Sequence, residues 1–237
     1  MISGRKALRA SSEDVTVQAD TAIFDVDGTL VDTNYQHALA WYQSFLRFGI
    51  VIPVWRIHRT IGMGGDQLVA ALAGENTEKD HGDALRETWS EEFDSYIDDV
   101  QAFDGAHELL SEVKRRGFKV VLASSGKQEH VERFIDLIDA KTLADAWTSS
   151  DDVTASKPEP DLVRTALEKV SGSHGVMIGD STWDIIAANK LRVPTIAVQT
   201  GGYSPKELTD AGAVDVFESL PELTRKLDST LLNRAHP

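Results

Sequence analysis

The sequence contains no cysteine, and it has few basic residues for its many acidic ones. Of 237 residues, 24 are Lys or Arg and 38 are Asp or Glu, which gives a net charge of −14. The lack of cysteine excludes disulfides and is typical of a reducing cytoplasm, where we expect the protein to reside. The shortage of cations argues against a nucleic-acid partner, because such proteins need Lys and Arg to displace the counterions of the polyanion.

Long apolar runs are missing too. No run approaches the ~20 residues that a helix needs to cross a bilayer, so we expect no membrane-spanning segment. Hydrophobic residues at 41% and charged residues at 26% are instead typical of a globular protein. Residues 1–20 are polar and contain no apolar core of a signal peptide, and we interpret them as an N-terminal tail.

Short apolar runs that end in small or polar residues predict strands covered on both faces. Four of them are prominent and two are shorter: Ala22–Val26, Phe118–Ala123, Gly175–Gly179, Val193–Val198, and then Ala146–Ser149 and Val214–Phe217. Helical patterns lie between most of them, including one that we expect to begin at Pro158 and one after Ser219. This alternation predicts an α/β fold with a doubly wound parallel sheet.

One long segment interrupts the alternation. Residues 34–101 show no strand pattern, but apolar residues recur at helical spacing over 35–46, 67–73 and 85–97. We therefore expect a smaller all-helical domain over 34–101, inserted into an α/β core of residues 21–33 and 102–237. Residues 31–33 and 101–104 are the expected hinges.

The segment Asp25-Val26-Asp27-Gly28-Thr29-Leu30 carries the strongest chemical signal. Its two carboxylates follow a predicted strand, and a turn at Gly28 would let them converge on one point. One carboxylate can attack phosphorus as a nucleophile, and the other can protonate a leaving alcohol and later deprotonate water. An ordinary Asp-Gly turn after a strand is the plainer interpretation of the same residues.

Three further signals lie at or beyond the ends of later predicted strands, the edge where open α/β sheets bind their ligands. Ser124, Ser125 and Lys127 precede a helix, where hydroxyls and backbone N–H groups suit phosphate oxygens. Lys157, held extended by the following proline, can neutralise a carboxylate and a phosphoryl group together. Asp180 and Asp184 suit a magnesium ligand and a supporting partner. Each signal also has a plainer explanation when taken alone. The serines can cap a helix, Lys157 can be a surface lysine, and acidic residues are common at a helix N-terminus.

Together and in this order, the four segments resemble the four motifs of the haloacid dehalogenase superfamily, from about Thr21 onward. The helical insert is similar to the α-helical cap of its subfamily I. The resemblance implies a phosphatase with Mg²⁺ as cofactor and a small phosphorylated metabolite as substrate. It further implies that Asp25 is the nucleophile and Asp27 the general acid/base.

The resemblance also implies the roles of the other motif residues. Ser124 and Lys157 would bind the transferring phosphoryl group. Mg²⁺ would bind Asp25, the main-chain carbonyl of Asp27 and Asp180, with Asp184 in support. We expect the cap to shield Asp27 from water, so that it can act as an acid near neutral pH. The further residues expected at the substrate are Gly28, Thr29, His37, Gly64, Ser125 and Lys127.

Two alternatives stay open. His37 and Lys127 also resemble residues of β-phosphoglucomutases, although the segment 62–66 lacks the Arg expected in a mutase. A receiver-like signalling protein would also accept phosphate on an aspartate, but it would have no inserted lid and no second Asp in the first motif. Neither the substrate nor the oligomeric state can be identified from the sequence.

Overall fold

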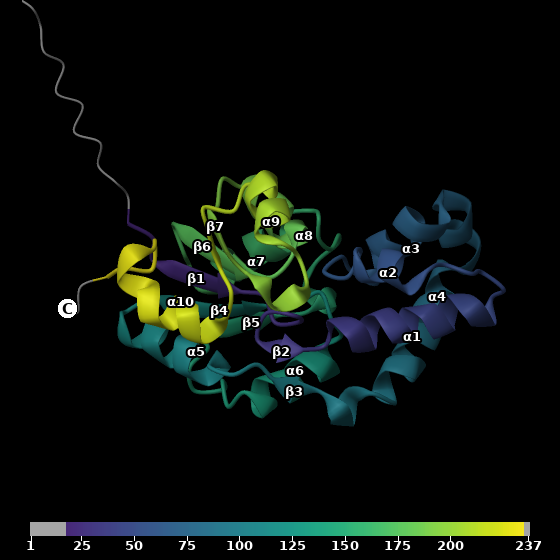
Figure 1. The fold of residues 1–237 in the computed structure, drawn as a ribbon, viewed down its shortest axis with the longest axis horizontal. Coiled ribbons are helices and arrows are strands. Elements are labelled where there is room, and N and C mark those ends of the chain that lie inside the picture. The colour runs from purple at the N-terminus through teal and green to yellow at the C-terminus, as the bar shows by residue number, and fades with distance from the viewer. Residues whose placement is uncertain (1–17, 235–237) are drawn as a thin grey trace, which may run out of the picture.

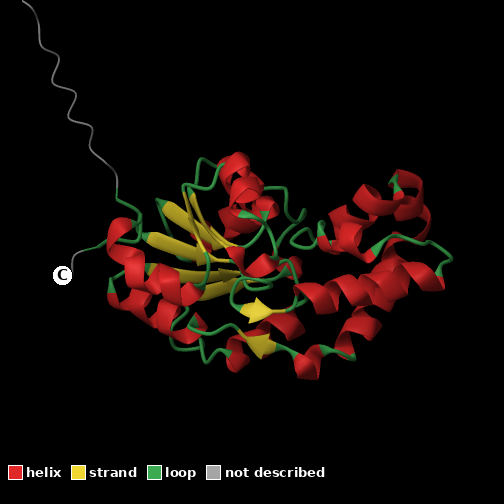
Figure 2. Ribbon diagram, viewed as in Figure 1, coloured by secondary structure: helices red, strands yellow, loops and turns green. Residues whose placement is uncertain are grey.

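A computed structural model describes residues 18–234. Six parallel strands form one sheet in the order β5-β4-β1-β6-β7-β8, and Figure 2 shows them as a fan in one half of the molecule. The strands are β1 (Thr21–Phe24), β4 (Lys119–Ala123), β5 (Ala146–Thr148), β6 (Gly175–Gly179), β7 (Thr195–Val198) and β8 (Asp215–Phe217). The predicted parallel α/β sheet is thus confirmed, with all six strands where the apolar runs indicated.

Apolar side chains cover both faces of this sheet, because successive residues of a strand point to opposite sides. On one face, Phe24, Leu122 and Ile178 share a core with helices α5 (Ala106–Arg115), α6 (Gln128–Leu137) and α10 (Leu220–Lys226). On the other, Ile23 and Met177 pack with helices α7 (Asp161–Lys169) and α8 (Thr182–Asn189). Helix α9 (Pro205–Ala211) contributes to a smaller cluster beside α8.

Helix α7 begins at Asp161, whereas we expected it to begin at Pro158. Residues 156–159 form a turn instead, closed by a hydrogen bond from the Glu159 amide to the Ser156 carbonyl at 2.9 Å. Because Lys157 belongs to this turn, its side chain is directed toward the ends of the strands rather than lying on a helix surface.

The inserted segment consists mainly of helices joined by loops and lies to one side of the sheet (Figure 1). Its helices are α1 (Asn34–Arg47), α2 (Val54–His58), α3 (Gly65–Ala73), α4 (Glu75–Asp94) and the short η1 (Ile97–Asp99). They enclose a separate apolar cluster around Trp41, Phe45, Leu68 and Leu85. The packing agrees with a cap over 34–101, but those domain boundaries stay a prediction.

The two expected hinges pair with each other, which the sequence did not indicate. Strand β2 (Val31–Asp32) and strand β3 (Gln101–Ala102) form an antiparallel pair, with Val31 opposite Ala102. The chain therefore leaves and re-enters the sheet layer through one short ribbon. Within residues 18–234, none of the helices has both the length and the apolar character needed to span a bilayer. The predicted tail lies mostly outside the described residues.

Candidate active site

The sheet order explains why residues far apart in the sequence meet. Strand β1 lies between β4 and β6, so the carboxyl ends of these three strands bring Asp25, Ser124 and Asp180 to one edge. Asp25 follows β1 directly and donates its amide hydrogen to Ile178 of β6. Gly28 adopts φ +79°, which turns the chain back toward that edge.

Three buried carboxylates form the centre of the site. Asp25, Asp180 and Asp184 each place an oxygen within 4.8 Å of the others, and their exposed fractions are 2%, 2% and 0%. Burial raises the pKa of Asp25 well above its ordinary value, and the neighbouring Asp184 and Asp180 raise it further. Burial together with Asp184 raises the pKa of Asp180 to about 7. Such crowded negative charge is what a cation would relieve.

Lys157 offsets part of this charge from within the site. Its Nζ donates to Asp25 Oδ1 at 2.5 Å and to Asp184 Oδ1 at 2.8 Å. Burial lowers the pKa of this ammonium, but the two carboxylates outweigh burial and raise it. Lys157 is therefore charged throughout the physiological range, and it bridges Asp25 and Asp184.

Two side chains, one of which had no role in the sequence analysis, orient Asp180. Thr29 Oγ1 donates to Asp180 Oδ1 at 2.9 Å and also to Asp25 Oδ2 at 3.2 Å. Asn34, the first residue of α1, donates from Nδ2 to Asp180 Oδ2 at 3.0 Å. We had placed Thr29 at the substrate and had given Asn34 no role. The structure places both side chains, and the backbone of Gly28, against Asp180.

Asp27 occupies a separate set of hydrogen bonds beside the three carboxylates. Its oxygens accept from Ser124 Oγ at 2.8 Å and Thr33 Oγ1 at 3.0 Å, and His37 Nε2 lies 3.0 Å away. Burial raises the pKa of Asp27, but these three groups outweigh burial and lower the pKa to about 2. We had expected shielding by the cap to favour the protonated acid. The donors supplied by Thr33, His37 and Ser124 reverse that effect.

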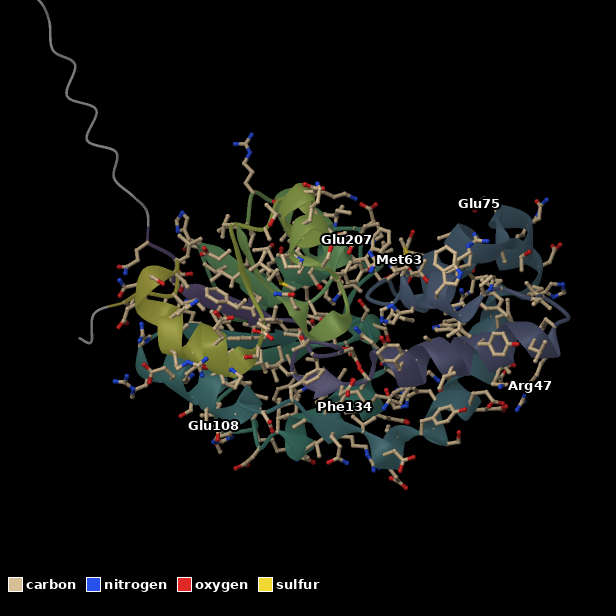
Figure 3. The ribbon with its side chains drawn as sticks, in the orientation of Figure 1. Arg47, Met63, Glu75, Glu108, Phe134 and Glu207 are labelled. Carbon is tan, nitrogen blue, oxygen red and sulfur yellow. The ribbon has the colours of Figure 1, made fainter. Side chains whose placement is uncertain are left out.

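A cavity of about 460 Å³ opens in front of these side chains. The predicted residues that line it are Asp25, Asp27, His37, Gly64, Ser125, Lys127 and Lys157. Gly64 approaches Ser156 so closely that its amide donates to Ser156 Oγ at 2.9 Å. Figure 3 shows Met63, which also lines the cavity, at the junction between the inserted helices and the sheet.

Further contacts hold the inserted helices against the sheet layer around this cavity. Lys127 Nζ donates to Ser90 Oγ of α4 at 2.6 Å. Trp183 Nε1 and Tyr203 Oη both donate to the Arg59 carbonyl, at 3.1 and 2.9 Å. These hydrogen bonds join the inserted segment to residues that follow β4, β6 and β7, beside the cavity.

The donor set suits a hard divalent cation. All three groups of the cluster offer carboxylate oxygens, which Mg²⁺ prefers. Asp27, which we expected to contribute only its main-chain carbonyl, has its carboxylate engaged outside this cluster. These observations support a divalent-metal site at Asp25, Asp180 and Asp184.

The loop after β7 contributes a glycine that the sequence analysis missed. A Cβ atom at Gly201 would overlap Asp180 Oδ2, so only glycine leaves room for this carboxylate. The pair Gly201-Gly202 after a predicted strand is the signal that would have marked the position.

Gly201→Ala is therefore expected to displace Asp180 and to weaken metal binding by about 10- to 100-fold, the range seen when support of a metal site is lost. Titration calorimetry with Mg²⁺ measures the effect. Thr200→Ala is the matched control, because it changes the adjacent residue without adding bulk beside Asp180. Equal affinity in Gly201→Ala and wild type would contradict this account of the loop.

A parallel sheet with acidic, hydroxyl and lysine side chains at one strand edge defines an α/β protein built for phosphoryl chemistry. The sequence model of haloacid dehalogenase-like hydrolases matches residues 22–198, and the chain belongs to this family. It is 28% identical over 212 residues to a phosphoglycolate phosphatase from Caulobacter vibrioides, covering 86% of this chain and 89% of the relative. The pyrophosphatase PpaX of Oceanobacillus iheyensis is 27% identical over 184 residues, covering 75% and 82%.

Among solved structures, a hydrolase from Pseudomonas syringae superposes with a TM-score of 0.83 at 31% identity. The match covers 88% of this chain and 98% of that structure. It therefore includes the inserted helices as well as the sheet, and both parts of the architecture recur in that relative.

Proposed function

We propose that the protein is a Mg²⁺-dependent phosphatase that hydrolyses small phosphorylated metabolites with Asp25 as nucleophile. The observation that carries the proposal is the position of Asp25: a carboxylate in contact with Lys157, inside a buried acidic cluster and facing a cavity. The family match and the phosphatases among its relatives support the same reaction class.

In the first step, a carboxylate oxygen of Asp25 attacks phosphorus, and the bond from phosphorus to the leaving oxygen breaks. Lys157 keeps the carboxylate oriented and offsets the charge of the phosphoryl group, since it already contacts Asp25. Such fixed positive charge near the reacting atoms is the main contribution that a protein makes to phosphoryl transfer. Ser125 and Lys127 line the cavity beside the site and would bind the phosphoryl oxygens or the leaving group.

Asp27 acts as the general acid and then as the general base. In its protonated form it gives a proton to the departing oxygen, and as a carboxylate it takes a proton from the water that cleaves the aspartyl-phosphate. With a pKa near 2 the carboxylate form prevails, so the resting site is prepared for the second step. Protonation of Asp27 becomes easier when one of the hydrogen bonds with Thr33, His37 or Ser124 is lost, because these groups stabilise the carboxylate form. An incoming substrate oxygen can displace such a donor.

Asp25, Asp180 and Asp184 would hold the Mg²⁺ ion. When bound, the ion neutralises charge on the phosphoryl oxygens and on the crowded carboxylates. Of the three carboxylates, Asp180 is the one best placed to bind only the Mg²⁺ ion. Thr29 and Asn34 orient its two oxygens, and Lys157 does not contact it. Asp184 serves two functions, since it also accepts hydrogen bonds from Lys157 and Ser181.

A screen of phosphorylated compounds that measures released phosphate tests the proposal. We expect release with Mg²⁺ and none after exhaustive chelation, and Asp180→Ala should raise the Mg²⁺ concentration needed for turnover, because it removes a direct ligand. Asp27→Asn should slow turnover and accumulate phosphorylated protein, which mass spectrometry detects as a phosphate adduct lost on hydroxylamine treatment. Unchanged activity under chelation would refute the metal site.

The same assay separates a phosphatase from a mutase. We expect β-glucose 1-phosphate with a trace of glucose bisphosphate to yield free phosphate rather than glucose 6-phosphate. The cavity supports this expectation, because the segment from Gly62 to Asp66 contributes no cation to it. Rapid isomerisation with little free phosphate would identify the mutase instead.

A further inference from the structure

A second cavity lies at the edge of the sheet opposite the active site, and its volume is about 710 Å³. Residues at or just before the amino ends of β1, β6 and β7 line it, among them Ala19, Gly175 and Pro194. The C-terminal segment closes one side with Thr230 and Leu231. Figure 1 shows this segment, in yellow, at the end of the molecule away from the inserted helices. None of the lining residues also lines the active-site cavity.

The titratable side chains of this second cavity are all basic. Arg192 and His174 line it, and no Asp or Glu within residues 18–234 does so. The carboxylate of Asp20 is close by, but it accepts hydrogen bonds from the Ser173 and His174 amides at 3.0 and 3.1 Å. Within the same residues, no hydrogen bond or ion pair joins the Arg192 guanidinium to another group. In a chain with a net charge of −14, a cavity with a free guanidinium and no carboxylate favours an anion.

The backbone of Arg192 gives an independent indication. Its φ of +58° lies in the left-handed region, which residues with side chains adopt at a cost. The Val193 amide donates to the Ala188 carbonyl at 3.0 Å, which ends α8 in a turn that usually has glycine at the position of Arg192. Asp139 and Ser171 have similar φ values of +50° and +49°, but their side chains are short. A long basic side chain at a position that favours glycine is therefore a feature that the fold itself does not require.

The rest of the lining is largely apolar and includes Leu167, Leu191 and Pro194. The volume falls within the ~300–1,000 Å³ typical of sites that enclose a small molecule. We propose that this cavity binds a small organic anion, with its charged group against Arg192 and His174 and its apolar body against the leucines. The site is separate from the proposed phosphatase centre, and its occupancy does not depend on that activity.

Binding of anilinonaphthalene sulfonate to the full-length wild-type chain tests the proposal, because this apolar anion becomes fluorescent in apolar surroundings. We expect saturable binding and displacement of the probe by octanoate. The uncharged octanamide has a chain of the same length and should displace the probe much less, because it cannot pair with the guanidinium. Equal displacement by the two compounds, or the lack of saturable binding, would refute an anion site.

Variants then locate the probe. Arg192→Gly should raise its Kd by about 10- to 100-fold, the effect of losing a hydrogen bond to a charged group. The variant should not lower the thermal midpoint, because glycine suits a φ of +58°. Asp139→Gly is the matched control, since it relieves a similar backbone conformation outside the cavity. Lys127→Met removes a cation from the active-site cavity and should leave the Kd unchanged. An unchanged Kd in Arg192→Gly, or a raised one in Lys127→Met, would overturn the assignment.

Discussion

Asp25→Asn is expected to reduce phosphate release by about 10³-fold or more, as loss of a nucleophile does in other enzymes. The amide keeps the shape of the side chain but cannot attack phosphorus. The fold should not suffer, because an ionised Asp25 is itself costly: burial and the neighbouring Asp184 and Asp180 raise its pKa. Without metal, the thermal midpoint of the variant should equal or exceed that of the wild type.

Steady-state assays and thermal unfolding in the presence of chelator measure the two parts of this prediction. Asp32→Asn is the matched control, since Asp32 is an exposed aspartate on β2 that makes none of these contacts. Substantial turnover in a folded Asp25→Asn protein would contradict the assignment of the nucleophile.

Lys157→Met is expected to remove activity and, unlike the first variant, to destabilise the protein. Lys157 lies 2% exposed between Asp25 and Asp184, and in residues 18–234 no other ammonium or guanidinium forms an ion pair with either carboxylate. Removing one member of a buried ion pair costs about 3–5 kcal/mol, because the remaining charges stay buried without compensation. Added Mg²⁺ should restore part of the stability, since it offsets the same carboxylates.

Denaturant unfolding with and without Mg²⁺ measures this effect. Lys206→Met is the comparison, because Lys206 pairs with Asp210 on the surface of α9 and such pairs are worth about 0–1 kcal/mol. If the two variants lose the same free energy of unfolding, Lys157 does not stabilise the buried carboxylates Asp25 and Asp184 as proposed.

The two predictions depend on the electrostatic repulsion among the buried carboxylates, which the two substitutions change in opposite directions. At Asp25, removing a charge relieves repulsion among carboxylates. At Lys157, removing a charge exposes that repulsion. Measuring both variants without metal therefore tests whether the acidic cluster is strained in its metal-free state, which the raised pKa of Asp180 also indicates.

Much of this site could be predicted because its parts are short and local. Each strand is an apolar run buried on both faces, and each motif follows the end of its strand, as Asp25 follows β1 and Asp180 follows β6. The helical insert was visible as a long stretch without strand patterns. The start of α7 was misplaced because proline permits a helix start but does not require one, and here it belongs to a turn.

The sequence by itself therefore determined the succession of strands and helices along the chain, the inserted helices, and the acidic, hydroxyl and lysine residues that follow the strand ends. Tertiary structure alone decided how these residues act on one another. The pKa of Asp27 depends on His37 and Ser124, and Asp180 depends on Asn34 and on space left by Gly201. Such contacts join segments distant in the chain, so they follow from packing and sheet order rather than from any local pattern of residues.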